Sequence, residues 1–126
     1  MRGTLIFDGR CGFCTRAMDL LTRIDRHGRV ETRAAQEPGV AARAGIAPDE
    51  LAKSVWWVHD SDRCSGAAAI NSALAAAIGR RLPLTIYRLP GVGTLQEAVY
   101  RRVAANRHRL PGTTPWCQRH PDRCAE

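Results

Sequence analysis

The amino-acid sequence predicts a single α/β domain, in which a mixed four-stranded sheet is flanked by helices. Short apolar segments typical of strands alternate with longer segments whose apolar residues recur at helical spacing. The chain has 126 residues, which is enough for the hydrophobic core of one ordinary domain. Hydrophobic residues make up 44% of the chain, close to the globular average, so disorder over the whole chain is not expected.

The first third of the chain predicts a strand–helix–strand unit. Residues 4–7 (Thr-Leu-Ile-Phe) form a short apolar run ended by Asp-Gly, which is typical of a buried strand entering a tight turn. Apolar residues follow helical spacing over residues 11–24, and Gly28 is expected at the C′ position of this helix. Residues 30–34 are expected to form the second strand, which a right-handed crossover joins to the first.

The middle of the chain predicts short helices and then a hairpin. Short helical segments are expected between Pro38 and Lys53, with an interruption at Gly45. Residues 55–59 are β-branched and aromatic and form the clearest predicted strand. The Asp-Ser-Asp turn that follows predicts a returning strand over residues 63–66.

Two helices and a tail are predicted in the last part of the chain. The apolar face of the first helix is expected to contain four residues at helical spacing, Ile70, Leu74, Ala77 and Ile78. Residues 94–97 (Thr-Leu-Gln-Glu) match a capping box, which predicts the start of a helix extending to about Arg109. We therefore expect a folded domain over residues 1–110 and an irregular, Cys-containing C-terminal tail over residues 111–126. The order of the elements is that of a thioredoxin-like fold with an added C-terminal helix.

The cysteines Cys11 and Cys14 are the candidate redox pair. They lie between a predicted buried strand and the start of a helix, where free backbone N–H groups and the helix dipole stabilise a thiolate. Cys11, at the more exposed end, is expected to attack a substrate disulfide, and Cys14 to resolve the mixed disulfide. Asp8 has two compatible candidate roles, as the helix N-cap and as acceptor of the Cys14 proton.

Two other functions remain open for this sequence. A C-x-x-C pair is also a common half of a zinc site, so Cys11 and Cys14 are alternatively structural residues of a zinc-binding or interaction module. The net charge of +7 permits binding to nucleic acid or to an acidic redox partner. No recognised nucleic-acid motif is present, so nucleic acid is not the partner we expect. The positive charge that could bind either partner is concentrated in a predicted basic helix, which contains Arg101, Arg102, Arg107 and Arg109.

The tail carries three further candidate ligands, Cys117, His120 and Cys124. One interpretation is a metal site completed by Cys64 or His59. A second is a dithiol relay that exchanges electrons with Cys14. The third, which we favour, is a mobile tail whose cysteines are incidental.

Residues 7–14 (Phe-Asp-Gly-Arg-Cys-Gly-Phe-Cys) resemble the hallmark of the DCC family of predicted thiol-disulfide oxidoreductases, a strand followed by Asp-Gly-x-Cys-x-x-Cys. Two weaker matches, at residues 65–69 and 100–107, extend the likeness over most of residues 4–110. The resemblance implies a thioredoxin-like fold and a redox use of the two cysteines. It also implies a functional role for Asp8.

One departure from the wider thioredoxin pattern concerns the predicted third strand. Proteins of that fold generally place a cis-proline before this strand, and here Ser54 precedes Val55. The expected substrates are protein or small-molecule thiols and disulfides, and no cofactor is expected. No apolar run approaches the roughly 20 residues of a membrane span, and residues 1–8 are too short and polar for a secretory signal. We therefore expect a cytoplasmic protein that does not bind membranes; the sequence carries no signal for an oligomeric state.

Overall fold

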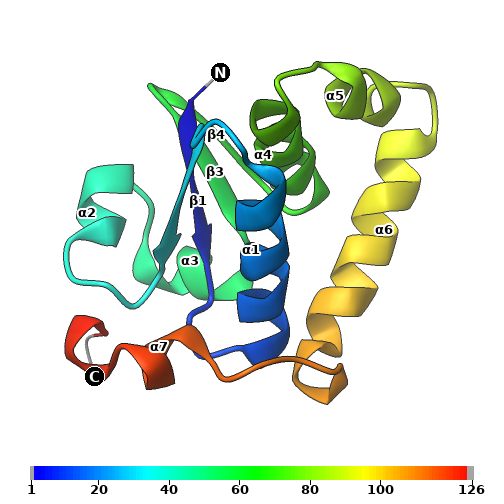
Figure 1. Ribbon diagram of the computed structural model, residues 1–126. Helices are drawn as coiled ribbons and strands as arrows, with labels where there is room; N and C mark the ends of the chain where they lie inside the picture. Colours follow the sequence, from blue (N-terminus) through cyan, green and yellow to red (C-terminus); the bar gives the residue numbers. More distant parts are fainter. Residues whose placement is uncertain (1, 125–126) are drawn as a thin grey trace.

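The chain forms the mixed, four-stranded open sheet that the sequence predicts, with helices on both sides (Figure 1). The computed structural model describes residues 2–124. The elements of this part are β1 (Gly3–Phe7), α1 (Gly12–Ile24), β2 (Val30–Ala34), α2 (Val40–Ala44), α3 (Pro48–Lys53), β3 (Trp56–His59), β4 (Asp62–Ser65), α4 (Ala67–Ile78), α5 (Leu82–Tyr87), α6 (Val92–Ala105), the 3-10 helix η1 (Arg107–Arg109), α7 (Trp116–Arg119) and the 3-10 helix η2 (Pro121–Arg123). The architecture is thioredoxin-like, as predicted.

Strand β1 lies inside the sheet, whose order is β2-β1-β3-β4. β2 pairs with it in parallel, with Phe7 opposite Ala34. β3 pairs with it in the antiparallel direction, with Ile6 opposite Trp56, and β4 returns beside β3 as a hairpin. The end of β1 therefore lies next to the start of β3, and the segment that carries the two cysteines leaves the sheet at this point.

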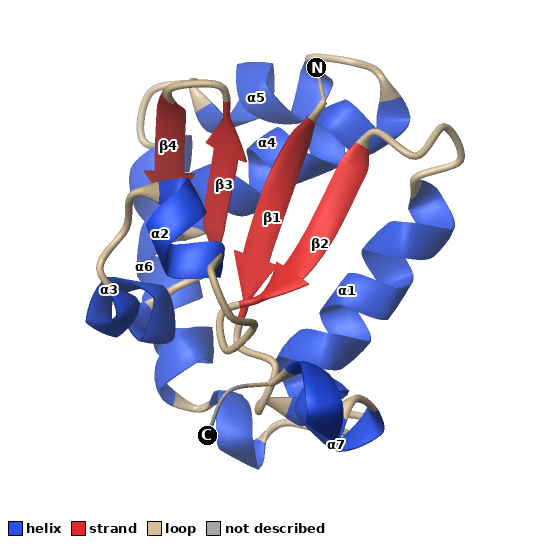
Figure 2. Cartoon of the chain, turned by 90° about the vertical axis from the view of Figure 1, so that its left-hand side faces the viewer, coloured by secondary structure: helices blue, strands red, loops and turns tan. Residues whose placement is uncertain are grey.

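Successive residues of β1 contribute to two hydrophobic cores, because side chains alternate between the faces of a sheet. Leu5 packs with Trp57 on the face covered by α1 and α4. Ile6 packs on the opposite face, onto which Figure 2 looks and which α2 and α3 cover. Both side chains are at most 2% exposed, and each such burial stabilises the fold by about 1.5–3 kcal/mol.

The buried face of α4 agrees with the prediction at Ala77, which is 2% exposed, and differs from it at the two isoleucines. Its fully buried residues are all alanines, whereas Ile70 and Ile78 are 44% and 39% exposed. Ala69, Ala73 and Ala76 pack directly against the side chains of the sheet and α1. Small residues permit this close approach of the helix, and the larger isoleucines face outward.

The predicted capping box at residues 94–97 is wrong. Helix α6 begins at Val92, and no side chain caps it. The Glu97 carboxylate instead accepts hydrogen bonds from the backbone N–H groups of Ala67 (2.9 Å) and Ala68 (3.3 Å), in the first turn of α4. Glu97 thus caps a neighbouring helix whose own N-cap residue is a glycine.

Two helix ends also differ from prediction. Helix α1 ends at Ile24, and the Asp25 carboxylate accepts from the N–H groups of Arg29 and Val30, so Gly28 lies in the turn beyond the helix rather than at C′. Helix α6 ends at Ala105 and is followed by η1. The short helix α5 was not predicted; it begins beside a proline and lies between two longer helices.

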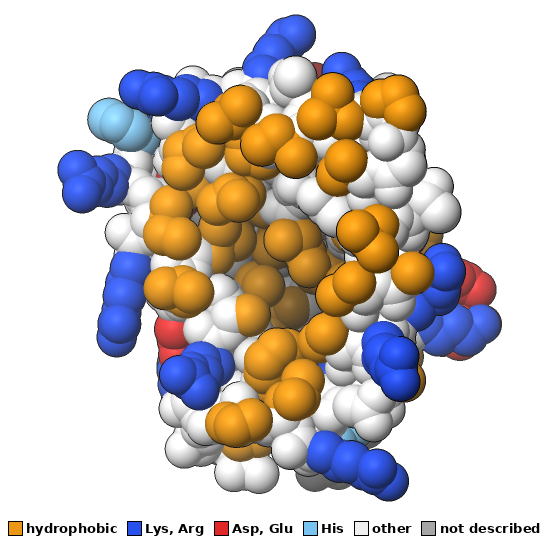
Figure 3. All heavy atoms as spheres, turned by 90° about the vertical axis from the view of Figure 1, so that its right-hand side faces the viewer, with side chains coloured by type: hydrophobic (Ala, Val, Ile, Leu, Met, Phe, Trp, Pro, Cys, Tyr) orange, Lys and Arg blue, Asp and Glu red, His pale blue; other side chains and the backbone are white. Residues whose placement is uncertain are grey.

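Helix α6 contacts α4 and α5 and buries none of its side chains completely. Leu95 and Val99 are 65% and 54% exposed. Figure 3 shows apolar side chains gathered around a hollow on this side of the molecule. Within residues 2–124, no helix is long and apolar enough to cross a bilayer.

Candidate functional site

Cys11 lies at the N-terminus of α1, where it is the N-cap residue. Its sulfur accepts a hydrogen bond from the backbone N–H of Cys14 (3.2 Å). Its carbonyl accepts from the N–H and the hydroxyl of Thr15, at 3.0 and 2.9 Å. The Cys11 sulfur therefore faces the free N–H groups and the positive end of the dipole of a 13-residue helix.

The sulfur atoms of the two cysteines lie 2.6 Å apart, and the Cys14 thiol donates to Cys11. Both cysteines are free thiols in the structure. A disulfide requires a separation of about 2.05 Å, so a small movement suffices to join them. The pair is thus placed for reversible oxidation.

The Cys14 thiol resists ionisation. Burial is the largest cause, followed by the hydrogen bond to Cys11 and the charge of Cys11, and together they raise the pKa of Cys14 to about 12. The charge of Asp8 also raises this pKa, whereas the charge of Arg107 lowers it. Cys14 therefore stays protonated near neutral pH, which suits a resolving cysteine better than an attacking one.

Asp8 is not the N-cap of α1, contrary to one of its two predicted roles. Cys11 occupies that position, and the Asp8 carboxylate is held by other groups. It accepts from the N–H of Arg10 (3.0 Å) and from Nε2 of Gln36 (2.8 Å). Its second oxygen forms an ion pair with Arg107 (3.1 Å). Asp8 thus connects the loop after β1 to residues much later in the chain.

Arg107 belongs to this site, although the sequence analysis placed it in a basic helix. Besides the ion pair with Asp8, it donates to the carbonyl of Ala52 at the end of α3 (3.2 Å). Its side chain is 17% exposed, whereas the neighbouring arginines of that helix are exposed. The signal for its role was the weak family match at residues 100–107, which ends on this residue.

Tyr100, in the same weak match, supports the chain before β3. Its hydroxyl oxygen accepts from the N–H of Val55 (2.9 Å) and lies 3.2 Å from Oγ of Ser54. The Ser54 oxygen also accepts from the N–H of Gly66. No peptide bond in the described part of the chain is cis. Side chains thus hold the segment at which thioredoxin-like proteins generally carry a cis-proline.

Cys11 is not the more exposed cysteine, contrary to prediction. It is 0% exposed, whereas Cys14 is half-buried. The C-terminal tail runs from the end of α6 beneath α1 and β1 (Figure 1). The tail covers the loop that carries the cysteines. Its N–H groups donate to the loop and to the first turn of α1. The N–H of Cys117 donates to the Gly9 carbonyl (2.9 Å), that of Thr113 to the Gly12 carbonyl (3.2 Å) and that of Trp116 to the Thr15 hydroxyl (3.0 Å).

The tail is ordered rather than mobile, which corrects the interpretation that we favoured. Trp116 packs edge-on against Phe7, with ring centroids 6.4 Å apart. Arg119 forms an ion pair with Asp19 of α1 (3.1 Å). A disulfide joins Cys117 to Cys124. The described part of the tail, residues 111–124, contains α7 and η2, and contacts between Thr113 and Arg119 tie it to the domain.

The third group of candidates, His59 and Cys64, lies apart from the tail. His59 Nδ1 contacts the carbonyl of Arg2, and the Cys64 sulfur lies 3.6 Å from Oγ of Ser72. Burial raises the pKa of the Cys64 thiol. Neither residue joins Cys117 and Cys124, which are bonded to each other. Among residues 2–124, no three His, Cys, Asp or Glu side chains are grouped as a metal site would require.

Comparison with known proteins gives one match. The model of the family described as DCC1-like thiol-disulfide oxidoreductase matches residues 5–113, which include β1, both cysteines of the pair and Arg107. No curated protein and no solved structure shows significant similarity to the chain.

Proposed function

Because the chain belongs to the DCC1-like thiol-disulfide oxidoreductase family, we propose that Cys11 and Cys14 alternate between a dithiol and a disulfide in exchange with substrate thiols or disulfides. The observation that carries the proposal is the placement of the two sulfurs, 2.6 Å apart at the N-terminus of α1. Both the helix terminus and the short separation favour this chemistry.

The proposed reaction gives the two cysteines different tasks. The Cys11 thiolate attacks one sulfur of a substrate disulfide, and the other substrate sulfur leaves as a thiol. Cys14 then loses its proton and attacks the Cys11 sulfur, which releases the second substrate thiol and leaves a Cys11–Cys14 disulfide. The raised pKa of Cys14 supports this order, because a protonated thiol does not compete for the first attack.

We assign Asp8 the role of accepting the Cys14 proton during resolution. Its negative charge acts on the Cys14 thiol, and Arg107 and Gln36 fix its position. The Asp8→Asn substitution is expected to slow the closure of the Cys11–Cys14 disulfide. Timed acid quench followed by alkylation measures this rate. Faster closure would contradict this role, because loss of a charge that raises the pKa of Cys14 would then be the dominant effect.

A cleft beside the pair supports the choice of an acidic redox partner. It has a volume of about 630 Å³, and its lining combines the apolar side chains of Phe13 and Leu20 with the cations of Arg16 and Arg23. Asp19 also lines the cleft, and its carboxylate forms an ion pair with Arg119. An apolar protein segment with neighbouring carboxylates matches this surface, because its apolar side chains fit the apolar lining and its carboxylates pair with the arginines. We therefore propose a protein disulfide of this chemistry as the substrate.

A glutathione redox titration tests the proposed function. The full chain is equilibrated at defined potentials, trapped by alkylation and analysed by mass spectrometry. We expect a reversible Cys11–Cys14 disulfide with a midpoint between about −270 and −120 mV. In the cytoplasm, the compartment that the sequence predicts, a midpoint above the glutathione poise of about −220 to −260 mV would keep the pair reduced. Failure of the two cysteines to pair at any potential would refute the proposal.

A further inference from the structure

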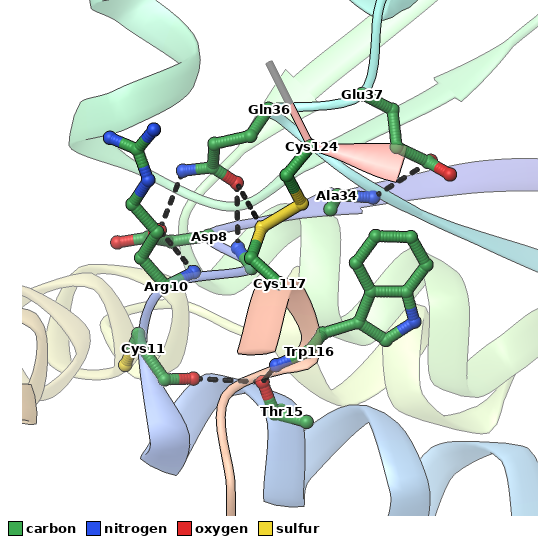
Figure 4. Close-up of a disulfide and its surroundings, with 11 residues drawn as sticks. Asp8, Arg10, Cys11, Thr15, Ala34, Gln36, Glu37, Trp116, Cys117 and Cys124 are labelled. Carbon is green, nitrogen blue, oxygen red and sulfur yellow. Dashed lines mark hydrogen bonds between the residues drawn. A yellow bond between two sulfur atoms is a disulfide. The ribbon is translucent and has the colours of Figure 1, made fainter. Parts of the chain in front are cut away.

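The Cys117–Cys124 disulfide lies against the loop that leads to Cys11 (Figure 4). The N–H of Cys117 donates to the carbonyl of Gly9 (2.9 Å). A Cβ atom added to Gly9 would lie 2.8 Å from the Cys117 sulfur, so the sulfur touches the backbone two residues before Cys11. Among the described residues, it is the one disulfide, and the other three cysteines are free thiols.

The tail also packs closely on the residue that follows Cys11. The backbones of Gly12 and Gly112 pack against each other so closely that a Cβ on Gly112 would lie 2.4 Å from the Gly12 carbonyl carbon. Cys11 is 0% exposed beneath this cover. Cys117 and Cys124 are only half-buried. An external disulfide therefore reaches the tail cysteines more easily than it reaches Cys11.

We propose that Cys117 and Cys124 form a second redox couple, through which electrons pass between the buried Cys11–Cys14 pair and an external substrate. The inference rests on the proposed redox use of Cys11 and Cys14 and adds the route by which a buried pair reacts. It assigns the tail cysteines a catalytic role, because their sulfurs take part in the exchange.

The structure holds the reactants of the internal step, a Cys11–Cys14 dithiol and a Cys117–Cys124 disulfide. The Cys11 thiolate attacks the Cys117 sulfur, the tail disulfide breaks, and Cys124 leaves as a thiolate that takes up a proton. Cys14 loses its proton and attacks Cys11, which forms the Cys11–Cys14 disulfide and releases Cys117 as a thiol. Two electrons and two protons have then moved to the tail, and no other oxidant is required.

The outer step uses the tail dithiol and the substrate disulfide of the proposed function. Cys117 or Cys124 attacks the substrate disulfide, and the other tail cysteine resolves the mixed disulfide. The tail disulfide forms again, and the substrate leaves as two thiols. Half-exposed tail cysteines are accessible to a protein disulfide without prior opening of the fold.

The internal step requires one conformational change. In Figure 4 the Cys11 thiol points away from the tail disulfide. It accepts the hydrogen bond from the N–H of Cys14 in this position. A change of the Cys11 χ1 rotamer must bring the sulfur toward Cys117 before attack. The rotation breaks the hydrogen bond between the N–H of Cys14 and the Cys11 sulfur.

A Cys14→Ser chain tests the internal step, because it cannot resolve the mixed disulfide. The full-length variant is oxidised in glutathione buffer, freed of glutathione, alkylated after denaturation and mapped by mass spectrometry without reduction. We expect a Cys11–Cys117 disulfide within one chain, together with an alkylated Cys124. Cys64, which lies on β4, provides an internal reference thiol that should be alkylated throughout. An intact Cys117–Cys124 disulfide beside an unpaired or glutathionylated Cys11 would overturn the proposal.

A second variant distinguishes failure of the inference from failure of the proposed function. In the Cys117→Ser, Cys124→Ser chain, the glutathione titration should still find a reversible Cys11–Cys14 pair. Oxidation of that pair by a protein disulfide should be at least about tenfold slower than in the natural chain, because the route through the tail is lost. An unchanged rate overturns the inference and leaves the proposed function in place. Absence of any Cys11–Cys14 pairing in the titration of the natural chain refutes the proposed function and, with it, the inference.

Discussion

The charge of Arg107 acts on the thiol of Cys14, which we propose as the resolving cysteine. Arg107 lowers the pKa of Cys14, which burial and Cys11 raise to about 12. Only the thiolate of Cys14 attacks, and below its pKa the thiolate fraction rises about tenfold for each pH unit. Closure of the Cys11–Cys14 disulfide should therefore accelerate as the pH rises from 7 to 10. The cation makes more thiolate available at any pH in this range.

Loss of this cation is expected to slow closure at a fixed pH. In Arg107→Gln the pKa of Cys14 should rise further, so closure at pH 8 should slow about threefold to tenfold. The whole rate–pH profile should move toward higher pH, and Arg107→Lys should restore most of the rate. Timed alkylation across the pH range measures both. A uniform loss of rate with no displacement of the profile would show that Arg107 acts only by supporting the fold.

The ion pair between Arg107 and Asp8 could not be predicted from the local sequence pattern. The local motif predicts Cys11, Cys14 and Asp8 as site residues, because all three lie within the seven residues that follow β1. Arg107 reaches Asp8 from the far end of the domain, and nothing in its local spacing distinguishes it from its neighbouring arginines. The burial of Cys11 likewise depends on chain that lies about a hundred residues later. Tertiary contacts decide these features.

At the scale of the elements, Glu97 joins three helices. From α6 it caps the N-terminus of α4, and its carboxylate accepts from the Tyr87 hydroxyl at the end of α5 (2.5 Å). The hydrogen bond to Glu97 is the main cause that raises the pKa of Tyr87 to about 12. An anion at a helix N-terminus is favourable because the free N–H groups and the dipole are positive there.

Replacing this anion by an amide should weaken the docking of α6. We expect Glu97→Gln to lower the free energy of unfolding by about 1–2 kcal/mol in urea denaturation. The pKa of Tyr87 should fall toward its ordinary value of 10.0, which ultraviolet titration reports. Glu50→Gln is the matched control, because Glu50 is 50% exposed and its pair with Lys53 contributes little. Equal stability losses in the two variants would contradict the capping role.

Elements were more predictable than the contacts between them. β2 was predicted at its observed bounds, and β1 and β3 to within one residue, because short β-branched and apolar runs ended by turn residues are local signals. The apolar face of α4 was misread because large residues dominate a sequence pattern, whereas close packing on the sheet selected alanines. The capping box at Glu97 failed for a related reason. A carboxylate near the start of one helix can accept hydrogen bonds from the free N–H groups of a neighbouring helix, as Glu97 does at Ala67.

For the whole molecule, the tail decides how accessible the redox pair is. Gly112 lies so close to Gly12 that a methyl group at residue 112 would displace the tail. We expect Gly112→Ala to increase native-state alkylation of Cys11 by iodoacetamide several-fold. Thr114→Ala, at an exposed position two residues later, should leave the rate unchanged. If both variants protect Cys11 as well as the natural chain does, the tail is not what buries it.

The order in which a chain is synthesised gives the tail a further consequence. The hydrogen bond between Trp116 and Thr15 joins residues 101 positions apart, and the ion pair between Arg119 and Asp19 joins residues 100 positions apart. Translation proceeds at about 5–20 residues per second, so the cysteine motif leaves the ribosome about 5–20 s before its cover has been made. During that interval the nascent chain presents an uncovered pair of thiols, and chaperones or oxidants of the growing polypeptide meet Cys11 in a form that the finished protein conceals.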